Sequence, residues 1–200
     1  MLPPSWAVSS GTRLDLDGFG AAFSQAWSRT ESRFLKLECW QAYREGHACE
    51  SQEVYERGDM ETARELLRRE AEADRPLYED VEKRHIDYSR IRLVREPLSP
   101  YLQYELLSYR IRAQMGENIE VVRCDSTVRL PSDEYFDVLL FDRREALIHD
   151  YGTGDVGWQS GGWLIEEPYV LARLEEMILA LRDGAIPLRR YPGRARTEQF

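Results

Sequence analysis

The sequence predicts an α/β or α+β domain in which helices flank a single mixed β-sheet. Segments with the period of a strand alternate with segments with the period of a helix along most of the chain. Two apolar runs around residues 135–151 are separated by a short polar turn, which is typical of a late β-hairpin. The last apolar residues, from Val170 to Leu181, recur at helical spacing and predict a C-terminal helix.

Chain length and composition indicate one globular domain. The chain has 200 residues, of which 11% are aromatic and 32% are charged, and single cores stop growing only somewhat above this size. Residues 1–13 include two prolines and several small polar residues and predict a flexible lead-in. Residues 187–200 predict a basic, flexible tail. We therefore expect one α/β domain over residues 14–186.

The charge of the chain narrows the classes of partner. A formal net charge of −9 works against binding of nucleic acid or anionic lipid by the whole surface. No stretch approaches about 18 consecutive apolar residues, the length that a membrane span needs, and the first residues lack a basic segment followed by an apolar one. We expect a cytoplasmic protein that does not contact a membrane and meets nucleic acid only indirectly. Direct DNA binding through the basic tail is an alternative.

The first half of the chain is predicted to contain three helices and one strand. Apolar residues at helical spacing predict a helix over residues 14–29, and alternation predicts a strand over residues 33–40 with Lys36 and Glu38 on one face. Two further helices follow, and Asp59 is placed to cap the second of them. The many Glu and Arg residues of that helix, 59–83, indicate a solvated face or a charged interaction arm.

A strand, a central helix and another strand follow. Alternating Arg and apolar residues predict a strand that ends at Glu96, because the residue before a proline disfavours helix. Ser99 is a good N-cap, and Gly116 is a natural helix end. The helix between them has two apolar faces, so we expect it to lie across the sheet.

The predicted hairpin has its turn at residues 142–144 and leads into a loop with five glycines over residues 152–163. Aromatic side chains in such a loop are suited to bind a partner, and two tryptophans are the candidates for this role: Trp158 and Trp163.

No strong catalytic or cofactor motif occurs in the sequence. The G-x-S-x-G elbow, the phosphate loop and the dinucleotide fingerprint are all absent. Cys39, His47 and Cys49 have the chemistry of zinc ligands, but they lack a second closely spaced pair, so free cysteines and a loop histidine are the favoured interpretation. We expect no cofactor, no metal and no catalytic residue.

The central helix supplies the candidate ligand site. Helical spacing places Tyr101, Glu105 and Arg112 on one stripe, and a strand ends just upstream, where α/β sheets commonly bind ligands. Arginine forks and an amide suit a small acidic or amide-bearing molecule. The candidate residues are Arg95, Glu96, Tyr101, Gln103, Glu105 and Arg112. The structural alternative is that Glu105 pairs with an arginine of a neighbouring strand, because a buried charge needs a partner.

Four segments together resemble the DUF6879 family of uncharacterised actinobacterial proteins over Phe34 to Leu181: "FLKLECWQAY", "VREPLSPYLQYELLSYRIRAQMGENIEVV", "FDVLLFDRREALIHDYG" and "EEPYVLARLEEMILAL". This resemblance implies a regulatory or accessory role beside helix-turn-helix regulators. The end of the chain is also similar to the C-terminal part of phospholipase-D-like domains. The H-x-K motif of these domains is absent, because the residues two positions after the three histidines are Cys49, Asp87 and Tyr151. A similar fold without this catalytic motif implies a binding or scaffold domain.

Two functional hypotheses follow. The first is a non-enzymatic regulatory or accessory protein that binds a protein partner, such as a helix-turn-helix regulator, through the tryptophan loop and the charged helix. The second is a small-molecule-binding protein or enzyme whose polar pocket lies beside residues 95–112.

Overall fold

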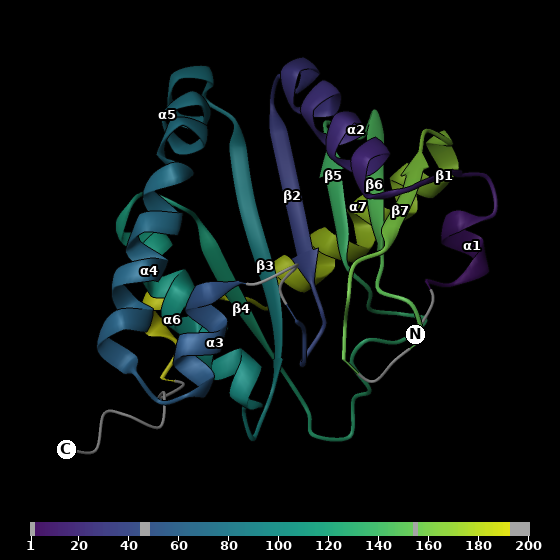
Figure 1. Ribbon diagram of the computed structural model, residues 1–200. Coiled ribbons are helices and arrows are strands. Elements are labelled where there is room, and N and C mark those ends of the chain that lie inside the picture. Colours follow the sequence, from purple (N-terminus) through teal and green to yellow (C-terminus); the bar gives the residue numbers. More distant parts are fainter. Residues whose placement is uncertain (1–2, 45–48, 154–155, 193–200) are drawn as a thin grey trace.

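Three parallel strands form the centre of the computed structural model, which describes residues 3–44, 49–153 and 156–192. These strands are β2 (Arg33–Glu38), β3 (Asp87–Arg95) and β4 (Ile119–Cys124). Antiparallel strands extend the sheet on the β2 side: β5 (Val138–Phe141), β6 (Glu145–Asp150), β7 (Gly161–Ile165) and β1 (Thr12–Leu14). The short β8 (Ile186–Pro187) pairs with β4, so the strand order is β1-β7-β6-β5-β2-β3-β4-β8. The predicted single mixed sheet is confirmed (Figure 1).

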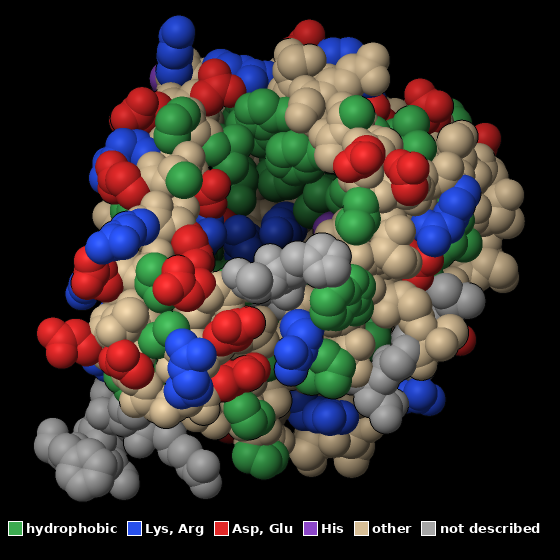
Figure 2. Space-filling view, viewed as in Figure 1, with side chains coloured by type: hydrophobic (Ala, Val, Ile, Leu, Met, Phe, Trp, Pro, Cys, Tyr) green, Lys and Arg blue, Asp and Glu red, His purple; other side chains and the backbone are tan. Residues whose placement is uncertain are grey.

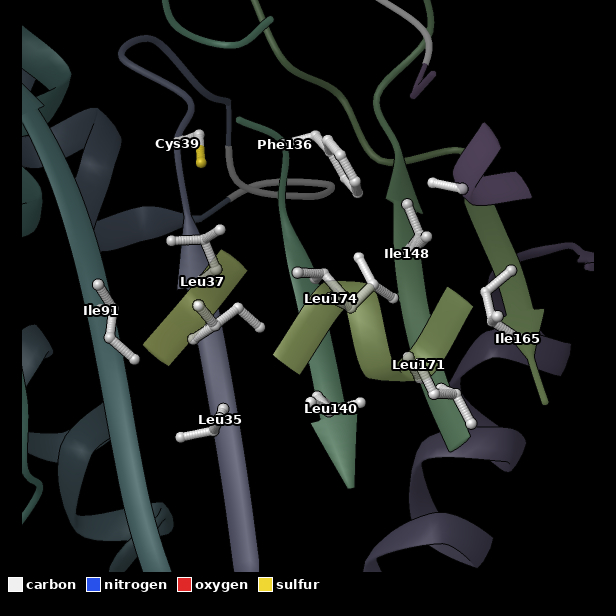
Figure 3. Packing of buried hydrophobic residues seen from close by; sticks show 14 of the residues in the cluster. Leu35, Leu37, Cys39, Ile91, Phe136, Leu140, Ile148, Ile165, Leu171 and Leu174 are labelled. Carbon is white, nitrogen blue, oxygen red and sulfur yellow. The ribbon is translucent and has the colours of Figure 1, made fainter. Parts of the chain in front are cut away.

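One face of the sheet is covered by α7 (Pro168–Asp183) together with the short α1 (Ser5–Val8). Alternate residues of the central strands point to this face and are apolar, as strand geometry requires of a buried face. Figure 3 shows Leu35, Leu140 and Ile148 of the strands among side chains of α7, and all three are at most 2% exposed. This layer is the largest apolar cluster among the described residues.

The other face carries two separate groups of helices. Helix α2 (Leu16–Arg29) lies over the β5–β7 side, where aromatic residues such as Phe34 and Phe141 pack beneath it. Helix α6 (Pro100–Gln114) packs on the β3–β4 side through Leu102 and Leu106. The remaining helices, α3 (Glu50–Glu56), α4 (Met60–Ala73) and α5 (Arg75–Arg84), stand beside α6 (Figure 1). Between α2 and this second group, no helix of the described residues covers the sheet.

The helices begin and end where the capping residues in the sequence predict. The Ser99 hydroxyl accepts a hydrogen bond from the N–H of Leu102, and the Asp59 carboxylate accepts one from the N–H of Thr62, so both predicted N-caps are confirmed. Gly116 has φ 106° just after α6, a backbone conformation that glycine adopts at little cost. Within the described ranges, no helix has the length and apolarity that crossing a membrane would require.

The predicted hairpin is formed by β5 and β6, and its turn is tied to β2. Asp142 and Arg143 adopt positive φ values of 48° and 58° in this turn. The Asp142 carboxylate accepts hydrogen bonds from the N–H groups of Ser32 and Arg33 at 2.9 and 2.7 Å. The turn therefore also fixes where β2 begins beside β5.

Three segments differ from the expected arrangement. Residues 5–14, for which the sequence predicts a flexible lead-in and the start of the first helix, form α1 and the edge strand β1. Residues 186–190 form β8 and a short 3-10 helix, and Leu188 and Tyr191 are buried against α6, so the folded domain extends into the predicted tail. Residues 161–163 belong to β7 rather than to the loop. Local sequence did not show these features because each depends on a distant strand or helix.

Candidate functional site

The part of the sheet that no described helix covers carries four charged side chains, which are called the floor below because a cavity lies over them. Strand alternation places Lys36 and Glu38 of β2 on the same face as Arg90 and Arg92 of β3. The parallel register sets Lys36 beside Arg90 and Glu38 beside Arg92. A strand at the centre of a sheet normally has apolar residues on both faces, so four adjacent charges here are unusual and mark this position.

Ion pairs connect these charges. The Lys36 ammonium lies 2.8 Å from the Glu38 carboxylate, and the Arg90 guanidinium bridges Glu38 at 3.0 Å and Glu117 at 2.6 Å. The hydroxyl of Tyr109 also donates to Glu38. Burial alone would raise the pKa of Glu38, but the positive charges of Arg90 and Lys36 outweigh burial and hold this pKa well below its ordinary value. Glu38 is therefore ionised at neutral pH.

Helix α6 forms one wall of a cavity over this floor. Tyr101, Glu105, Ser108 and Arg112 follow one another at spacings of three and four residues, so they share one face of the helix and line the cavity. The cavity has a volume of about 360 Å³, which is within the range of small-molecule sites. Figure 2 shows this hollow between the two groups of helices, with hydrophobic side chains at one end and Lys and Arg side chains at its base.

Arg92 and Glu105 join the floor to this wall. The side chain of Arg92 is 1% exposed, and its Nη2 lies 2.6 Å from Glu105 Oε2. Its Nε donates to the same oxygen at 2.8 Å, and Nη2 also donates to the carbonyl oxygen of Trp40. The remaining nitrogen, Nη1, is buried and meets no hydrogen-bond acceptor among the described residues.

Two titratable groups on the β5–β6 side also line the cavity, the buried Asp137 and the half-buried His149. The Asp137 carboxylate accepts hydrogen bonds from the N–H of Cys39 at 2.5 Å and from the Tyr151 hydroxyl at 3.0 Å. Burial, with the nearby charge of Glu38, raises the pKa of Asp137 to about 6. Burial, with the nearby charge of Lys36, lowers the pKa of His149 to about 3, so this imidazole is neutral at pH 7. Its Nδ1 has no hydrogen-bond partner in the part of the chain that the structure describes.

The cavity contains three of the six residues predicted to bind a ligand: Tyr101, Glu105 and Arg112. The pairing of Glu105 with an arginine of a neighbouring strand, which was the structural alternative, is also present in the Arg92 contact. Arg112 forms an ion pair with Asp74 at the end of α4. Glu105 and Arg112 are therefore part of both the internal ion-pair network and the cavity wall, and the Tyr101 hydroxyl donates to Glu105 at 2.8 Å.

The other three predicted residues lie outside the cavity. Arg95 follows the alternation of β3 onto the opposite face and donates to the carbonyl oxygen of Val128 at 3.4 Å. Glu96 forms an ion pair with Arg123 at 3.1 Å, and Gln103 donates to the carbonyl oxygen of Leu98 at 3.2 Å. The assumption that a ligand lies at the carboxyl end of the strand does not match the cavity, which lies over the middle of the sheet. Charged residues at alternate positions of β2 and β3 are the sequence signal that could have indicated the floor.

The two predicted partner-binding tryptophans have different surroundings. Trp158 is 43% exposed, beside Val156 at 51%. Trp163 lies in β7, is half-buried against the core below α7, and has the Arg13 guanidinium 4.5 Å from its ring centroid. Trp158 is therefore the better placed of the two to contact a partner.

The cysteine cluster falls partly outside the described residues, because His47 is not among them. Cys39 is fully buried, and the sulfur of Cys49 lies 3.3 Å from the Ser51 hydroxyl oxygen. Within the described segments, no group of three or more His, Cys, Asp or Glu side chains is arranged to hold a metal ion.

Comparisons with known proteins give a family and one partial structural likeness. No curated protein shows a significant match to the chain. One similar solved structure is that of TrmBL2, an archaeal chromatin protein with a novel mode of DNA binding, at 10% sequence identity and a TM-score of 0.44. The alignment covers 92% of this chain and 55% of that one, and at this level of similarity it does not indicate what the present chain binds. The model of the domain of unknown function DUF6879 matches residues 21–192, and the chain therefore belongs to the DUF6879 family.

Proposed function

We propose that the protein binds a small molecule in the cavity between α6 and the sheet. The observation that carries this proposal is that Arg92 is a residue of the cavity lining and that its buried Nη1 meets no acceptor within the described ranges. A buried donor without a partner costs about 1–3 kcal/mol, and an oxygen atom of a ligand seated in the cavity would remove this cost. Buried polar groups without partners are rare in native proteins and often mark a binding function.

The position of Arg92 suits this role. Its contacts with Glu105 and with the Trp40 carbonyl oxygen hold the guanidinium in place, so little side-chain freedom is lost when a ligand binds. The cavity walls are also tied to one another by ion pairs, including Arg112 with Asp74. A site supported in this way is already formed before the ligand arrives.

Small molecules retained by the full-length protein from its native host provide the test. The protein is purified, denatured, and the released compounds are identified by mass spectrometry. Ser108→Phe should abolish retention, because Ser108 is a half-buried residue of the cavity wall and a phenyl ring there fills the space. Leu107→Phe is the matched control on the same helix, since Leu107 does not line the cavity. Retention of the same compound by Ser108→Phe, or of none by the wild type, would contradict the proposal.

Binding of a protein partner is the second candidate. Val156 and Trp158 support it, because two large apolar side chains two residues apart are both more than 40% exposed, and aromatic anchors of this kind often dominate protein contacts. A regulatory role beside a helix-turn-helix protein belongs to this proposal. Trp158→Ser should then abolish co-purification of a stoichiometric protein partner, while Trp163→Phe should preserve it.

A further inference from the structure

The charges around the cavity are already balanced by the protein itself. Among the residues that the structure describes, four cationic side chains line the cavity, and each pairs with a carboxylate: Lys36 and Arg90 with Glu38, Arg92 with Glu105, and Arg112 with Asp74. Five acidic side chains of the same described segments also line it. A site built for an anion would instead leave cationic groups in excess of acidic ones.

An anionic ligand is therefore disfavoured in spite of the arginines. Its charge would lie near the carboxylates of Glu38 and Glu105, which are held in the floor and wall, and like charges repel strongly in a partly buried site. An anion bound at Arg92 Nη1 would share this guanidinium with the Glu105 carboxylate, which already occupies Nε and Nη2, and would lie close to that negative charge. A neutral ligand avoids this repulsion.

The two polar atoms without described partners specify what such a ligand must present. Arg92 Nη1 carries only N–H donors and so requires an acceptor oxygen or nitrogen. A neutral imidazole has one donor and one acceptor nitrogen, so the unpartnered Nδ1 of His149 requires a complementary group of either kind. A hydroxyl or an amide suits either atom, because each of these groups can both accept and donate hydrogen bonds.

Aromatic side chains supply the remaining wall surface. Trp40, Tyr101, Tyr109 and Tyr151 are among the lining residues, and ring faces pack favourably against the flat face of a cyclic ligand. Resting on the proposed small-molecule site, we propose that the ligand is an uncharged ring compound that presents hydroxyl or amide groups to Arg92 and His149. The cavity then rejects the carboxylate or phosphate counterpart of the same compound.

Nicotinamide and nicotinate test this inference as a matched pair, since they share a ring and differ in an amide against a carboxylate. Each is titrated into the full chain at pH 7.5 while the side-chain NMR signals of Arg92 and His149 are followed. Nicotinamide should bind about tenfold more tightly than nicotinate, equivalent to about 1.4 kcal/mol. Arg92→Met should abolish the response, while Arg123→Met, in an exposed pair with Glu96, should retain it. Ser108→Phe serves the same purpose if Arg92→Met does not fold.

The outcomes separate the two proposals. Equal or tighter binding of nicotinate at these signals would overturn the uncharged ligand class while leaving a small-molecule site in place. Absence of any response to either compound at concentrations up to solubility would overturn both proposals. Tighter binding of nicotinamide that survives in Ser108→Phe would place binding outside the cavity and would also overturn the inference.

Discussion

Arg92 of β3 and Glu105 of α6 form a buried ion pair that joins the sheet to the helix, with 2.6 Å between Nη2 and Oε2. The guanidinium is 1% exposed and the carboxylate is 12% exposed. Burial lowers the pKa of Arg92, but the charge of Glu105 outweighs it and the pKa lies well above the ordinary value. Arg92 is therefore charged in the folded protein, and the ion pair stabilises the fold only when both side chains are present.

Glu105→Gln is expected to lower the free energy of unfolding by about 3 kcal/mol, because removing one member of a buried pair leaves the other charge uncompensated. Urea denaturation at pH 7.5 measures this change. Glu31→Gln is the control, since Glu31 pairs with Arg144 at the surface, with exposed fractions of 71% and 55%, and should change stability by less than about 1 kcal/mol. A change in Glu105→Gln no larger than that of the control would show that the pair is not important for stability.

Asp137 is expected to make stability depend on pH. Burial raises its folded pKa to about 6, above the ordinary value of 3.8, so the folded protein binds more protons than the unfolded chain between these values. The contribution of Asp137 to stability must therefore increase as the pH falls from about 6 to about 4. The difference in free energy of unfolding between wild type and Asp137→Asn should shift in favour of the wild type by up to about 3 kcal/mol between pH 7 and pH 4.

Comparison with Asp137→Asn removes the contributions of the neighbouring groups, which titrate in both proteins. Glu38 has a pKa held low, and the pKa of His149 is also lowered, so these two groups weaken the fold as the pH falls. A difference between wild type and Asp137→Asn that is constant from pH 7 to pH 4 would contradict the raised pKa of Asp137.

His149 is expected to remain neutral well below the pH at which a histidine in a peptide gains its proton. Burial and the nearby Lys36 lower its pKa to about 3, whereas an unperturbed histidine has a pKa of about 6.5. The ¹⁵N shifts of its ring should stay constant between pH 7.5 and pH 5. A midpoint above pH 6 in this titration would place the imidazole in water rather than in the cavity lining.

Two glycines give opposite predictions for the same substitution. A Cβ at Gly162 would lie 2.3 Å from the carbonyl oxygen of Ile148 and 2.6 Å from the ring of Phe19, so Gly162→Ala should destabilise by about 1–3 kcal/mol. A Cβ at Gly20 would meet nothing within 4 Å, and Gly20 is an exposed residue inside α2. Gly20→Ala should therefore stabilise by about 0.5–1 kcal/mol. Thermal unfolding of both variants measures the contrast, and equal shifts would refute the close approach of α2 to β7.

The sequence by itself determined the features that depend on near neighbours along the chain. The Ser99 and Asp59 caps need only an oxygen and an N–H three residues later. The β5–β6 hairpin needs two apolar runs and a short turn, and α7 needs its apolar stripe. Alternation alone also placed Lys36 and Glu38 on one face, as the structure confirms.

Tertiary structure decided where the cavity is and which residues enclose it. Lys36 meets Arg90 only because β2 and β3 pair in parallel across more than 50 residues of chain, and no local pattern fixes such a register. His149 and Asp137 line the same cavity because the hairpin lies on the other side of β2. Arg95 and Glu96 are adjacent in sequence to this site, yet the twofold period of β3 and the end of the strand place them elsewhere. Residues 5–14 likewise became α1 and β1 because β7 and the core below α7 provided partners that lie about 150 residues away.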